Sequence, residues 1–187
     1  YAAIANGGTI WQPTVAKAIL NQQGKLIKRF EPVKLGELTA DAETIAFLHD
    51  ALQEVTLSGT SAGVFSRFPV PTAGKTGTAQ VFGRNSNGTQ KADTSWYASF
   101  APAKKPRYAV VMMVSQGGFG SSTSGLGVRQ IYETLFGVQG NIVKPELALF
   151  PKGKPPIKLP RISPAKKPAA SILNLDIAKK EIPVTKP

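Results

Sequence analysis

The segment Ala73-Gly-Lys-Thr-Gly-Thr-Ala-Gln80 decides how this 187-residue chain is interpreted. Its Gly-Lys-Thr could belong to a phosphate-binding loop, but such a loop needs a further glycine five positions before the one at 74. That position holds Pro69. A phosphate loop must also lead into a helix, whereas the threonines that follow, spaced by small residues, are typical of a strand. We therefore predict a strand over residues 74–82 and disfavour a nucleotide site.

A strand that carries Lys-Thr-Gly-Thr has the groups needed to bind a peptide ending in a free carboxylate. The Lys75 cation and the hydroxyls of Thr76 and Thr78 are donors for a carboxylate, and Gly77 lets a ligand backbone approach closely. A peptide paired along the strand would bring a reacting carbonyl toward the Thr78 N–H, which can stabilise an oxyanion. Side chains alternate along a strand, so Lys75 and Thr76 serve one ligand only at the strand's edge or where the strand is twisted. The alternative is an exposed strand with a surface lysine.

Patterns on either side of this segment predict helices packed on an antiparallel sheet. Tyr1–Gly8 ends a helix, since Asn-Gly-Gly supplies a left-handed stop, and residues 41–56 have apolar side chains at helical spacings. The other expected elements are hairpin strands over 15–20 and 26–30, a Gly/Ser-rich loop over 58–63, strands over 95–101 and 108–115, and a helix over 125–136. Short connections favour antiparallel pairing, and the apolar run at 109–114 predicts a central strand buried on both faces. The fold class is therefore α/β or α+β.

Composition excludes several classes of protein. The chain is 42% hydrophobic, which is ordinary for a globular protein, and it has no cysteine. Disulfide scaffolds, zinc–thiolate sites, iron–sulfur clusters and thiol catalysis are thereby excluded. No apolar run reaches the roughly 18 residues of a membrane-spanning helix, and no signal peptide is visible. The sequence starts at Tyr1 within a helix, so we expect a piece of a longer protein.

Positive charge is concentrated toward the C-terminal end. Residues 1–137 carry 13 Lys and Arg against 8 Asp and Glu, whereas residues 138–187 carry 10 against 3 and hold 9 of the 15 prolines. We therefore predict a folded domain over 1–137 and a basic, Pro/Lys-rich, disordered tail over 138–187. The alternative for the tail is binding to an anionic lipid or polymer surface. Its single aromatic residue, Phe150, gives little support for stacking on nucleic acid.

Residues 1–137 resemble the C-terminal part of the transpeptidase domain of class B penicillin-binding proteins. Ala73–Ala79 matches the family's Lys-Thr-Gly motif in full, and Tyr1–Gly8 followed by Pro13 resembles its Tyr-Ala-Ala-Ile-Ala-Asn-Gly-Gly helix end. Further similar segments, in the family's order, are Gly59-Thr-Ser-Ala62, Trp96-Tyr-Ala-Ser-Phe-Ala-Pro102 and Pro106-Arg-Tyr-Ala-Val-Val111. The run Gln116-Gly-Gly-Phe-Gly is most similar to the elongation-type enzymes, penicillin-binding protein 2.

The resemblance implies a fold, an activity and a set of site residues. The fold would be the C-terminal portion of a penicillin-binding, serine β-lactamase-like domain. The parent protein would be a D,D-transpeptidase that cross-links peptidoglycan stem peptides ending in D-Ala-D-Ala and is acylated by β-lactams. Lys75 and Thr76 would bind the carboxylate, Thr78 would supply the oxyanion N–H, and Gly77 would shape the strand along the substrate. Trp96 would lie beside the site or pack in the core. No metal, other cofactor or nucleic acid is implied.

The family's serine nucleophile, in Ser-x-x-Lys, has one formal match in this chain. Ser163-Pro-Ala-Lys166 lies in the Pro/Lys-rich tail, where no rigid scaffold is expected to hold the serine against the lysine. No Ser-x-Asn motif precedes Lys75 either. Both motifs come before Tyr1 in the family's order, so we expect no catalytic residue in this chain and no activity from it alone. The single histidine, His49, is expected to be structural.

The resemblance also implies where the parent protein acts and with which partners. Its domain would lie on the extracytoplasmic face of the cell membrane, held by an anchor N-terminal to Tyr1. Elongation-type relatives partner a SEDS-family glycan polymerase. Two other functions stay open. One is a β-lactamase-like hydrolase, and the other is a non-catalytic module that binds a peptide or an anionic polymer.

Overall fold

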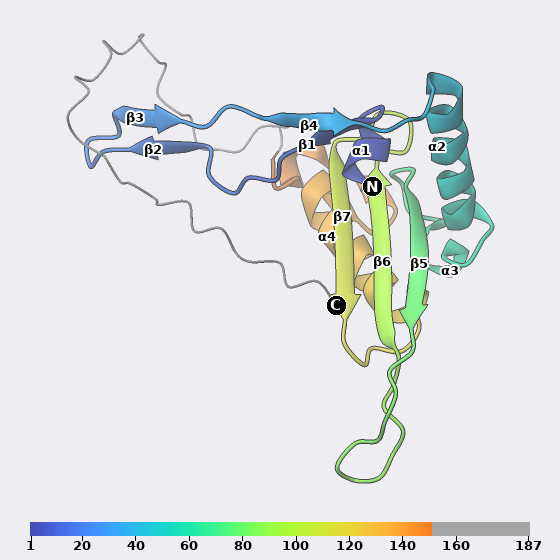
Figure 1. Ribbon diagram of the computed structural model, residues 1–187. Coiled ribbons are helices and arrows are strands. Elements are labelled where there is room, and N and C mark those ends of the chain that lie inside the picture. Colours follow the sequence, from blue (N-terminus) through green and yellow to red (C-terminus); the bar gives the residue numbers. More distant parts are fainter. Residues whose placement is uncertain (151–187) are drawn as a thin grey trace. The chain divides into compact units, whose positions relative to one another are not determined.

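The computed structural model describes residues 1–150, which fall into two units (Figure 1). The larger unit takes in residues 1–17 and 30–150, and the smaller one takes in residues 18–29. The α-helices of the larger unit are α1 (Ala2–Ala5), α2 (Ala42–Leu57), α3 (Ala62–Phe65) and α4 (Leu126–Phe136). It also has a short π-helix, η1 (Ser121–Gly125), and a short 3-10 helix, η2 (Pro145–Leu147). Its strands are β1 (Thr9–Trp11), β4 (Lys34–Glu37), β5 (Ala73–Ala79), β6 (Thr94–Ala101), β7 (Tyr108–Val114), β8 (Val138–Gln139) and β9 (Ile142–Val143).

Strands β5, β6 and β7 form one antiparallel sheet in that order. The predicted antiparallel pairing is confirmed, but the expectation that the third strand would be central is wrong. Within residues 1–150, β6 is the central strand and β7 is an edge. The apolar run of β7 is half-buried on one face only, because Val110 and Met112 pack against the main core whereas Val111 and Met113 are more than half exposed.

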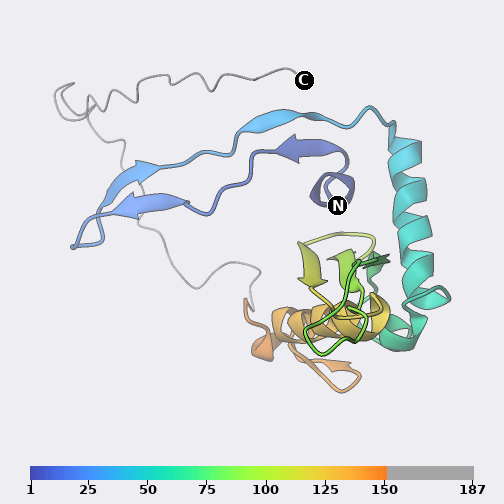
Figure 2. The same cartoon turned by 60° about the horizontal axis from the view of Figure 1, so that its bottom comes forward.

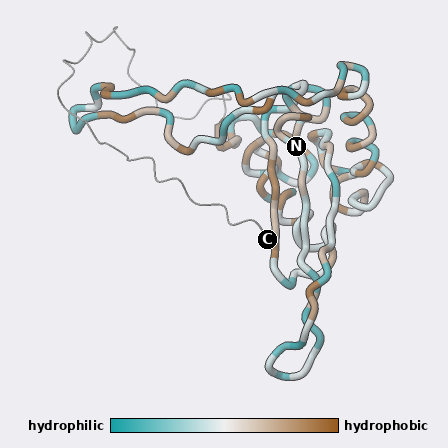
Figure 3. Tube along the Cα trace, in the orientation of Figure 1, coloured by the Kyte–Doolittle hydropathy of each residue, from teal (hydrophilic) through white to brown (hydrophobic). Residues whose placement is uncertain are grey.

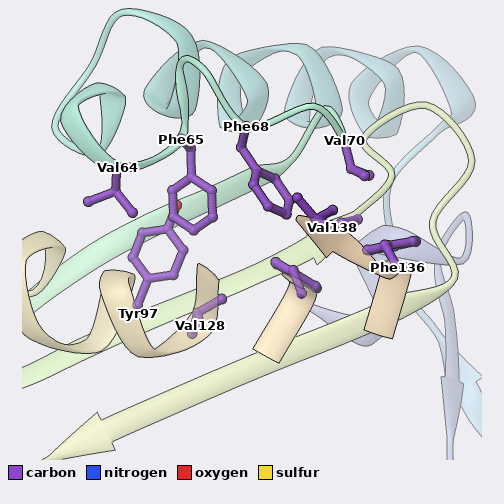
Figure 4. Close-up of a cluster of buried hydrophobic side chains, with 10 residues drawn as sticks. Val64, Phe65, Phe68, Val70, Tyr97, Val128, Phe136 and Val138 are labelled. Atoms are coloured by element: carbon purple, nitrogen blue, oxygen red, sulfur yellow. The ribbon is translucent and has the colours of Figure 1, made fainter. Parts of the chain in front are cut away.

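One face of the sheet and α4 enclose the main hydrophobic core (Figures 2 and 4). Tyr97 of β6 stacks on Phe65 of α3 with ring centroids 5.3 Å apart, and such aromatic pairs add to the stabilisation from burial. The other buried members are Val64, Phe68, Val70, Ala101, Val128, Tyr132, Phe136 and Val138. The loop predicted over 58–63 leads into the helical turn α3. This turn is too short to show a periodic spacing of apolar residues in the sequence.

Helix α2 confirms the helix predicted over 41–56. Asp41 is its N-cap, and its carboxylate accepts a 2.7 Å hydrogen bond from the Thr44 N–H. This bond satisfies one of the unpaired donors at a helix start and lowers the pKa of Asp41. The exact start of α2 is therefore set by a single side chain.

Helices α1 and α2 pack against the second face of the sheet. Residues that meet there are Tyr1, Ile4, Ala5, Leu52, Ala73, Phe100 and Ala103. His49 of α2 lies among them, with its ring 4.7 Å from that of Phe100. Its Nε2 is 2.9 Å from the Ile4 carbonyl oxygen, and its Nδ1 is 3.2 Å from that of Ala103. His49 thus joins three segments of the fold.

The fold continues beyond the domain boundary predicted at residue 137. Gly137 ends α4 in the left-handed conformation, with φ of 69°, and Val138 is buried in the main core. Strands β8 and β9 pair as a hairpin, and the Leu149 N–H donates to the Thr134 carbonyl oxygen at 2.9 Å. The rest of the predicted tail, together with the formal Ser163–Lys166 match, falls in residues 151–187, outside the described residues.

Two small antiparallel pairs complete the described chain. In the larger unit, β1 pairs with β4. In the smaller unit, β2 (Ala18–Leu20) pairs with β3 (Leu26–Arg29), as predicted for a hairpin. Asn21 stabilises its turn, because its side-chain oxygen accepts from the N–H groups of Gln23 and Lys25.

The sheet exposes an apolar strip made of Trp96, Val111 and Met113. Trp96 lies opposite Met113 in the register, and Val111 lies opposite Ala98, so the strip runs along one face of β6 and β7. These side chains are 41%, 57% and 52% exposed, and β7 is one of the more hydrophobic segments in Figure 3.

None of the helices within residues 1–150 combines the length and apolarity needed to cross a membrane.

Candidate active-site wall

Strand β5, at an edge of the sheet, carries four of the predicted site residues, and the fifth, Trp96, lies on the neighbouring β6. Thr76 lies opposite Tyr97 and Gly77 lies opposite Trp96 in the pairing with β6. Directly paired residues share a face, so Thr76 shares the face of the main core, whereas Lys75 and Gly77 share the face of Trp96. The alternation expected from the sequence is therefore present.

Lys75 and Thr76 nevertheless meet at the strand's edge. Lys75 Nζ donates to the Thr76 carbonyl oxygen at 3.1 Å and lies 3.4 Å from Thr76 Oγ1. Lysine has a flexible four-carbon stem, which lets the ammonium pass around an edge strand to the hydroxyl on the other face. This is the edge geometry that the sequence argument required for one ligand to contact both residues.

A second hydroxyl, which sequence reasoning missed, lies at the same point. Thr60 Oγ1 is 3.0 Å from Thr76 Oγ1. Thr60 belongs to the short loop between α2 and α3, and the resemblance marked this loop without giving it a role. No local pattern reveals the contact, because it depends on how the loop folds against β5.

Thr78 is contacted by the loop that follows β7. The Gly120 N–H donates to Thr78 Oγ1 at 3.3 Å. A β-carbon at Gly120 would lie 2.5 Å from the Gly77 carbonyl oxygen and 2.6 Å from that of Trp96. The loop can lie this close to β5 and β6 only because residue 120 is glycine.

A buried serine pair holds this loop in place. Ser95 and Ser124 are fully buried, and their hydroxyl oxygens lie 2.8 Å apart. Ser95 Oγ also lies 3.0 Å from the Phe119 carbonyl oxygen and accepts from the Ser124 N–H at 3.1 Å. Buried polar groups with satisfied hydrogen bonds make a local structure rigid, so Gly120 is presented to Thr78 in a defined position.

Within residues 1–150 no strand pairs with the outer edge of β5, and backbone groups of Thr76 and Thr78 face this free edge. In an antiparallel strand, the N–H and C=O of one residue point to the same side, and that side alternates along the chain. Lys75 Nζ reaches the Thr76 carbonyl oxygen, whereas the backbone N and O of Gly77 lie together with the Trp96 carbonyl oxygen. By alternation, the Thr78 N–H is directed to the same edge as the Thr76 carbonyl.

Trp96 lies beside Gly77 at the surface of the sheet. A β-carbon at Gly77 would be 3.1 Å from the Trp96 Cβ, so glycine lets the two strands pack with the indole alongside. The 41% exposure of Trp96 favours a place beside the site over packing in the core. Lys75, Thr76, Gly77, Thr78 and Trp96 are therefore brought together as a wall along β5.

The described residues contain no candidate nucleophile of the Ser-x-x-Lys kind. None of the serines within residues 1–150 is followed three positions later by a lysine. His49 is engaged by two backbone carbonyls between α1 and the β6–β7 turn. Within residues 1–150, the wall therefore offers hydrogen-bond donors for a ligand without a serine of this kind beside them.

Comparison with known proteins identifies the domain. Residues 1–133 match the family model of the penicillin-binding protein transpeptidase domain. The peptidoglycan D,D-transpeptidase MrdA of Salmonella typhimurium is 28% identical over 159 residues, which cover 78% of this chain and 25% of the relative. The chain thus spans about a quarter of the length of this curated relative.

Solved structures agree with this match. The D,D-transpeptidase domain of a peptidoglycan glycosyltransferase from Eggerthella lenta is 30% identical, with a TM-score of 0.60 over 75% of this chain and 31% of that chain. Pseudomonas aeruginosa PBP2, solved in complex with WCK 5153, is 28% identical, with a TM-score of 0.62 over 79% of this chain and 31% of that chain. The chain therefore belongs to the penicillin-binding protein transpeptidase domain family and is similar to its class B, penicillin-binding protein 2 members.

Proposed function

We propose that this chain forms the carboxylate-binding and oxyanion-binding wall of a peptidoglycan D,D-transpeptidase. One observation carries the proposal: the Lys75 ammonium and the Thr76 hydroxyl meet at the free edge of β5. The Thr78 N–H is directed to the same edge. The activity named for the MrdA relative supports this assignment.

A stem peptide ending in D-Ala-D-Ala would lie along β5. Its terminal carboxylate would accept hydrogen bonds from Lys75 and Thr76, and charge-assisted bonds of this kind are the strong ones. Its backbone would pair with the edge of the sheet. The scissile carbonyl oxygen would then accept from the Thr78 N–H, which stabilises the negative charge that develops during acyl transfer. Trp96 and Gly77 would flank the peptide.

The nucleophile would be a serine in a Ser-x-x-Lys segment N-terminal to Tyr1. Its Oγ would bond to the penultimate D-Ala carbonyl carbon, and the peptide C–N bond would break as its nitrogen takes up a proton. Terminal D-Ala would leave with its carboxylate. An amine of a second stem peptide would then displace the serine and complete the cross-link. A β-lactam, which carries a strained amide and a carboxylate, would acylate the same serine. The reaction would then stop at this serine ester.

By the same resemblance, the parent protein would lie on the extracytoplasmic side of the cell membrane. An anchor N-terminal to Tyr1 would hold it there, close to newly made glycan strands. A SEDS-family glycan polymerase is the proposed partner, and this chain would contribute the peptide-binding wall to their joint reaction.

Acylation of the natural polypeptide by benzylpenicillin tests the proposal. Intact-mass measurement should show one added penicilloyl group, on a serine of a Ser-x-x-Lys motif upstream of Tyr1. Lys75→Met and Thr76→Val should each slow acylation about 10- to 100-fold, because each removes a donor to a charged group. Lys105→Met, which changes an exposed lysine in the β6–β7 turn, is the control and should leave the rate unchanged.

Two results would contradict the proposal. A polypeptide without an upstream Ser-x-x-Lys that forms no penicilloyl adduct would leave only a peptide-binding module. Rapid turnover of a chromogenic cephalosporin, with quick loss of the acyl group, would instead assign a β-lactamase-like hydrolase.

A further inference from the structure

We infer that Thr60 is a positioning residue for the carboxylate site and that its hydroxyl, paired with that of Thr76, directs a proton toward the ligand carboxylate. The inference rests on the function proposed above and adds a residue outside β5 to it. Its starting point is the 3.0 Å separation between the hydroxyl oxygens of Thr60 and Thr76.

The loop that carries Thr60 is tightly folded against the end of α2. The Gly59 N–H donates to the Glu54 carbonyl oxygen at 3.1 Å. A β-carbon at Gly59 would lie 2.8 Å from Val55 Cα, so only glycine permits this close approach. The path of the chain into Thr60 is therefore fixed by backbone contacts.

The residue after Thr60 fixes the loop from the other side. Ser61 is fully buried and its hydroxyl donates to the Val55 carbonyl oxygen at 3.0 Å. Ser61 Oγ also lies 3.0 Å from Tyr97 OH. Because the single Ser61 proton is engaged by Val55, the Tyr97 hydroxyl is the donor in that contact.

These contacts close a ring of interactions around Thr76. Tyr97 is the β6 residue opposite Thr76 in the sheet, and it is bonded to Ser61, the neighbour of Thr60. Thr60 in turn contacts Thr76. The position of Thr60 relative to Thr76 is therefore set by the buried core and the sheet register, although Thr60 itself is exposed.

Counting donors shows what the hydroxyl pair supplies. The Lys75 ammonium only donates, so Thr76 Oγ1 acts as an acceptor toward it. If Thr60 donates to Thr76, the Thr76 proton is left for a ligand; if Thr76 donates to Thr60, the Thr60 proton is left. In both arrangements the pair offers one directed hydroxyl proton beside the ammonium. Without Thr60, the Thr76 hydroxyl has no such partner to fix its direction, and preorganisation is lost.

The experiment compares two substitutions at residue 60 with two ligands that differ in their carboxylate. In the natural polypeptide, Thr60→Val removes the hydroxyl with little change of shape, and Thr60→Ser keeps it. Acylation rate constants are measured with benzylpenicillin and with its methyl ester, in which the carboxylate is masked. Thr134→Val is the control, since Thr134 is an exposed α4 residue whose hydroxyl donates to the Gln130 carbonyl oxygen of its own helix.

A role in carboxylate recognition predicts a ligand-dependent effect. Thr60→Val should lower the benzylpenicillin rate constant about tenfold, the scale of one hydrogen bond to a charged group. The same substitution should change the methyl-ester rate constant less than about twofold, because no carboxylate is bound. Thr60→Ser and Thr134→Val should stay close to wild type with both ligands.

Each other outcome overturns the inference. Equal losses with both ligands would make Thr60 a support of the fold, and no loss with either would leave it without a role. If Lys75→Met shows the carboxylate-dependent loss and Thr60→Val does not, only the inference fails. If the wild-type polypeptide forms no penicilloyl adduct, the proposed function fails and the inference fails with it.

Discussion

Replacing Gly120 with alanine should lower both the free energy of unfolding and the rate of acylation. Both effects have the same cause, which is the steric clash of the added β-carbon. Gly120 has φ of −58° and ψ of −43°, which alanine adopts without strain. The added β-carbon would lie 2.5 Å from the Gly77 carbonyl oxygen and 2.6 Å from that of Trp96. Both contacts are with backbone atoms of paired strands, so the loop has to move and the sheet does not.

The size of the effect follows from the displacement. Ordinary contact begins at 3.4 Å, so the loop must move by about 0.9 Å to relieve the 2.5 Å contact. Overpacking of this kind costs about 1–3 kcal/mol of stability. The same shift lengthens the 3.3 Å bond from the Gly120 N–H to Thr78 Oγ1. A displacement near 1 Å in a catalytic site can cost about 100-fold in rate, so we expect a 10- to 100-fold loss of acylation.

Urea unfolding and benzylpenicillin acylation of the natural polypeptide measure the two effects. Gly63→Ala is the matched control: Gly63 lies in α3 with nothing within 4 Å of an added β-carbon. Alanine there should raise the free energy of unfolding by about 0.5–1 kcal/mol, because alanine is favoured over glycine in a helix. The rate of acylation should not change. A Gly120→Ala variant as stable and as readily acylated as wild type would show that the loop does not rest on β5 and β6.

Three further predictions concern the core and the exposed face. Burial raises the pKa of Tyr97 to about 12, above the roughly 10 of an exposed tyrosine. The folded state therefore keeps the phenol proton longer, so the stability from Tyr97 is full below pH ~10 and falls as the pH rises toward 12. Tyr97→Phe should lower the free energy of unfolding by about 1 kcal/mol at pH 7 and weaken this alkaline decline in urea titrations. Arg129→Met should lower the free energy of unfolding by about 1–3 kcal/mol in the same assay. The reason is that the Val64 carbonyl oxygen loses the 2.6 Å hydrogen bond from Arg129 Nη1. Val111→Thr combined with Met113→Thr should leave the melting temperature almost unchanged, since both side chains are more than half exposed, while raising the concentration at which this chain stays monomeric in sedimentation.

Local chemistry made part of the fold predictable from sequence. The helix over 41–56 was predictable from the spacing of its apolar residues, and the structure has it as Ala42–Leu57. The capping role of Asp41 emerged only from the structure. The strands and their antiparallel pairing follow from short connections between β-rich segments. The edge position needed for Lys75 and Thr76 was a condition derived from alternation, and β5 meets it.

The features that sequence reasoning missed depend on tertiary packing. The apolar run of β7 predicts a central strand, yet within residues 1–150 its outer edge has no neighbouring strand and one face is exposed. Thr60 gives no local signal, because its contact with Thr76 is made by a loop that Ser61 and Tyr97 hold in place. Because the sequence after residue 137 is rich in Pro and Lys, it gave no sign that Val138 is buried in the core. This burial depends on the left-handed turn at Gly137.

A crystal structure of the natural polypeptide acylated by a penicillin would show whether β5 is the wall that binds the ligand. We expect the ligand carboxylate to lie within hydrogen-bond distance of both Lys75 Nζ and Thr76 Oγ1, at the free edge of β5. We also expect the acyl carbonyl oxygen to accept a hydrogen bond from the Thr78 N–H. A ligand bound covalently elsewhere, or one whose carboxylate contacts neither Lys75 nor Thr76, would contradict the assignment of β5 as the binding wall.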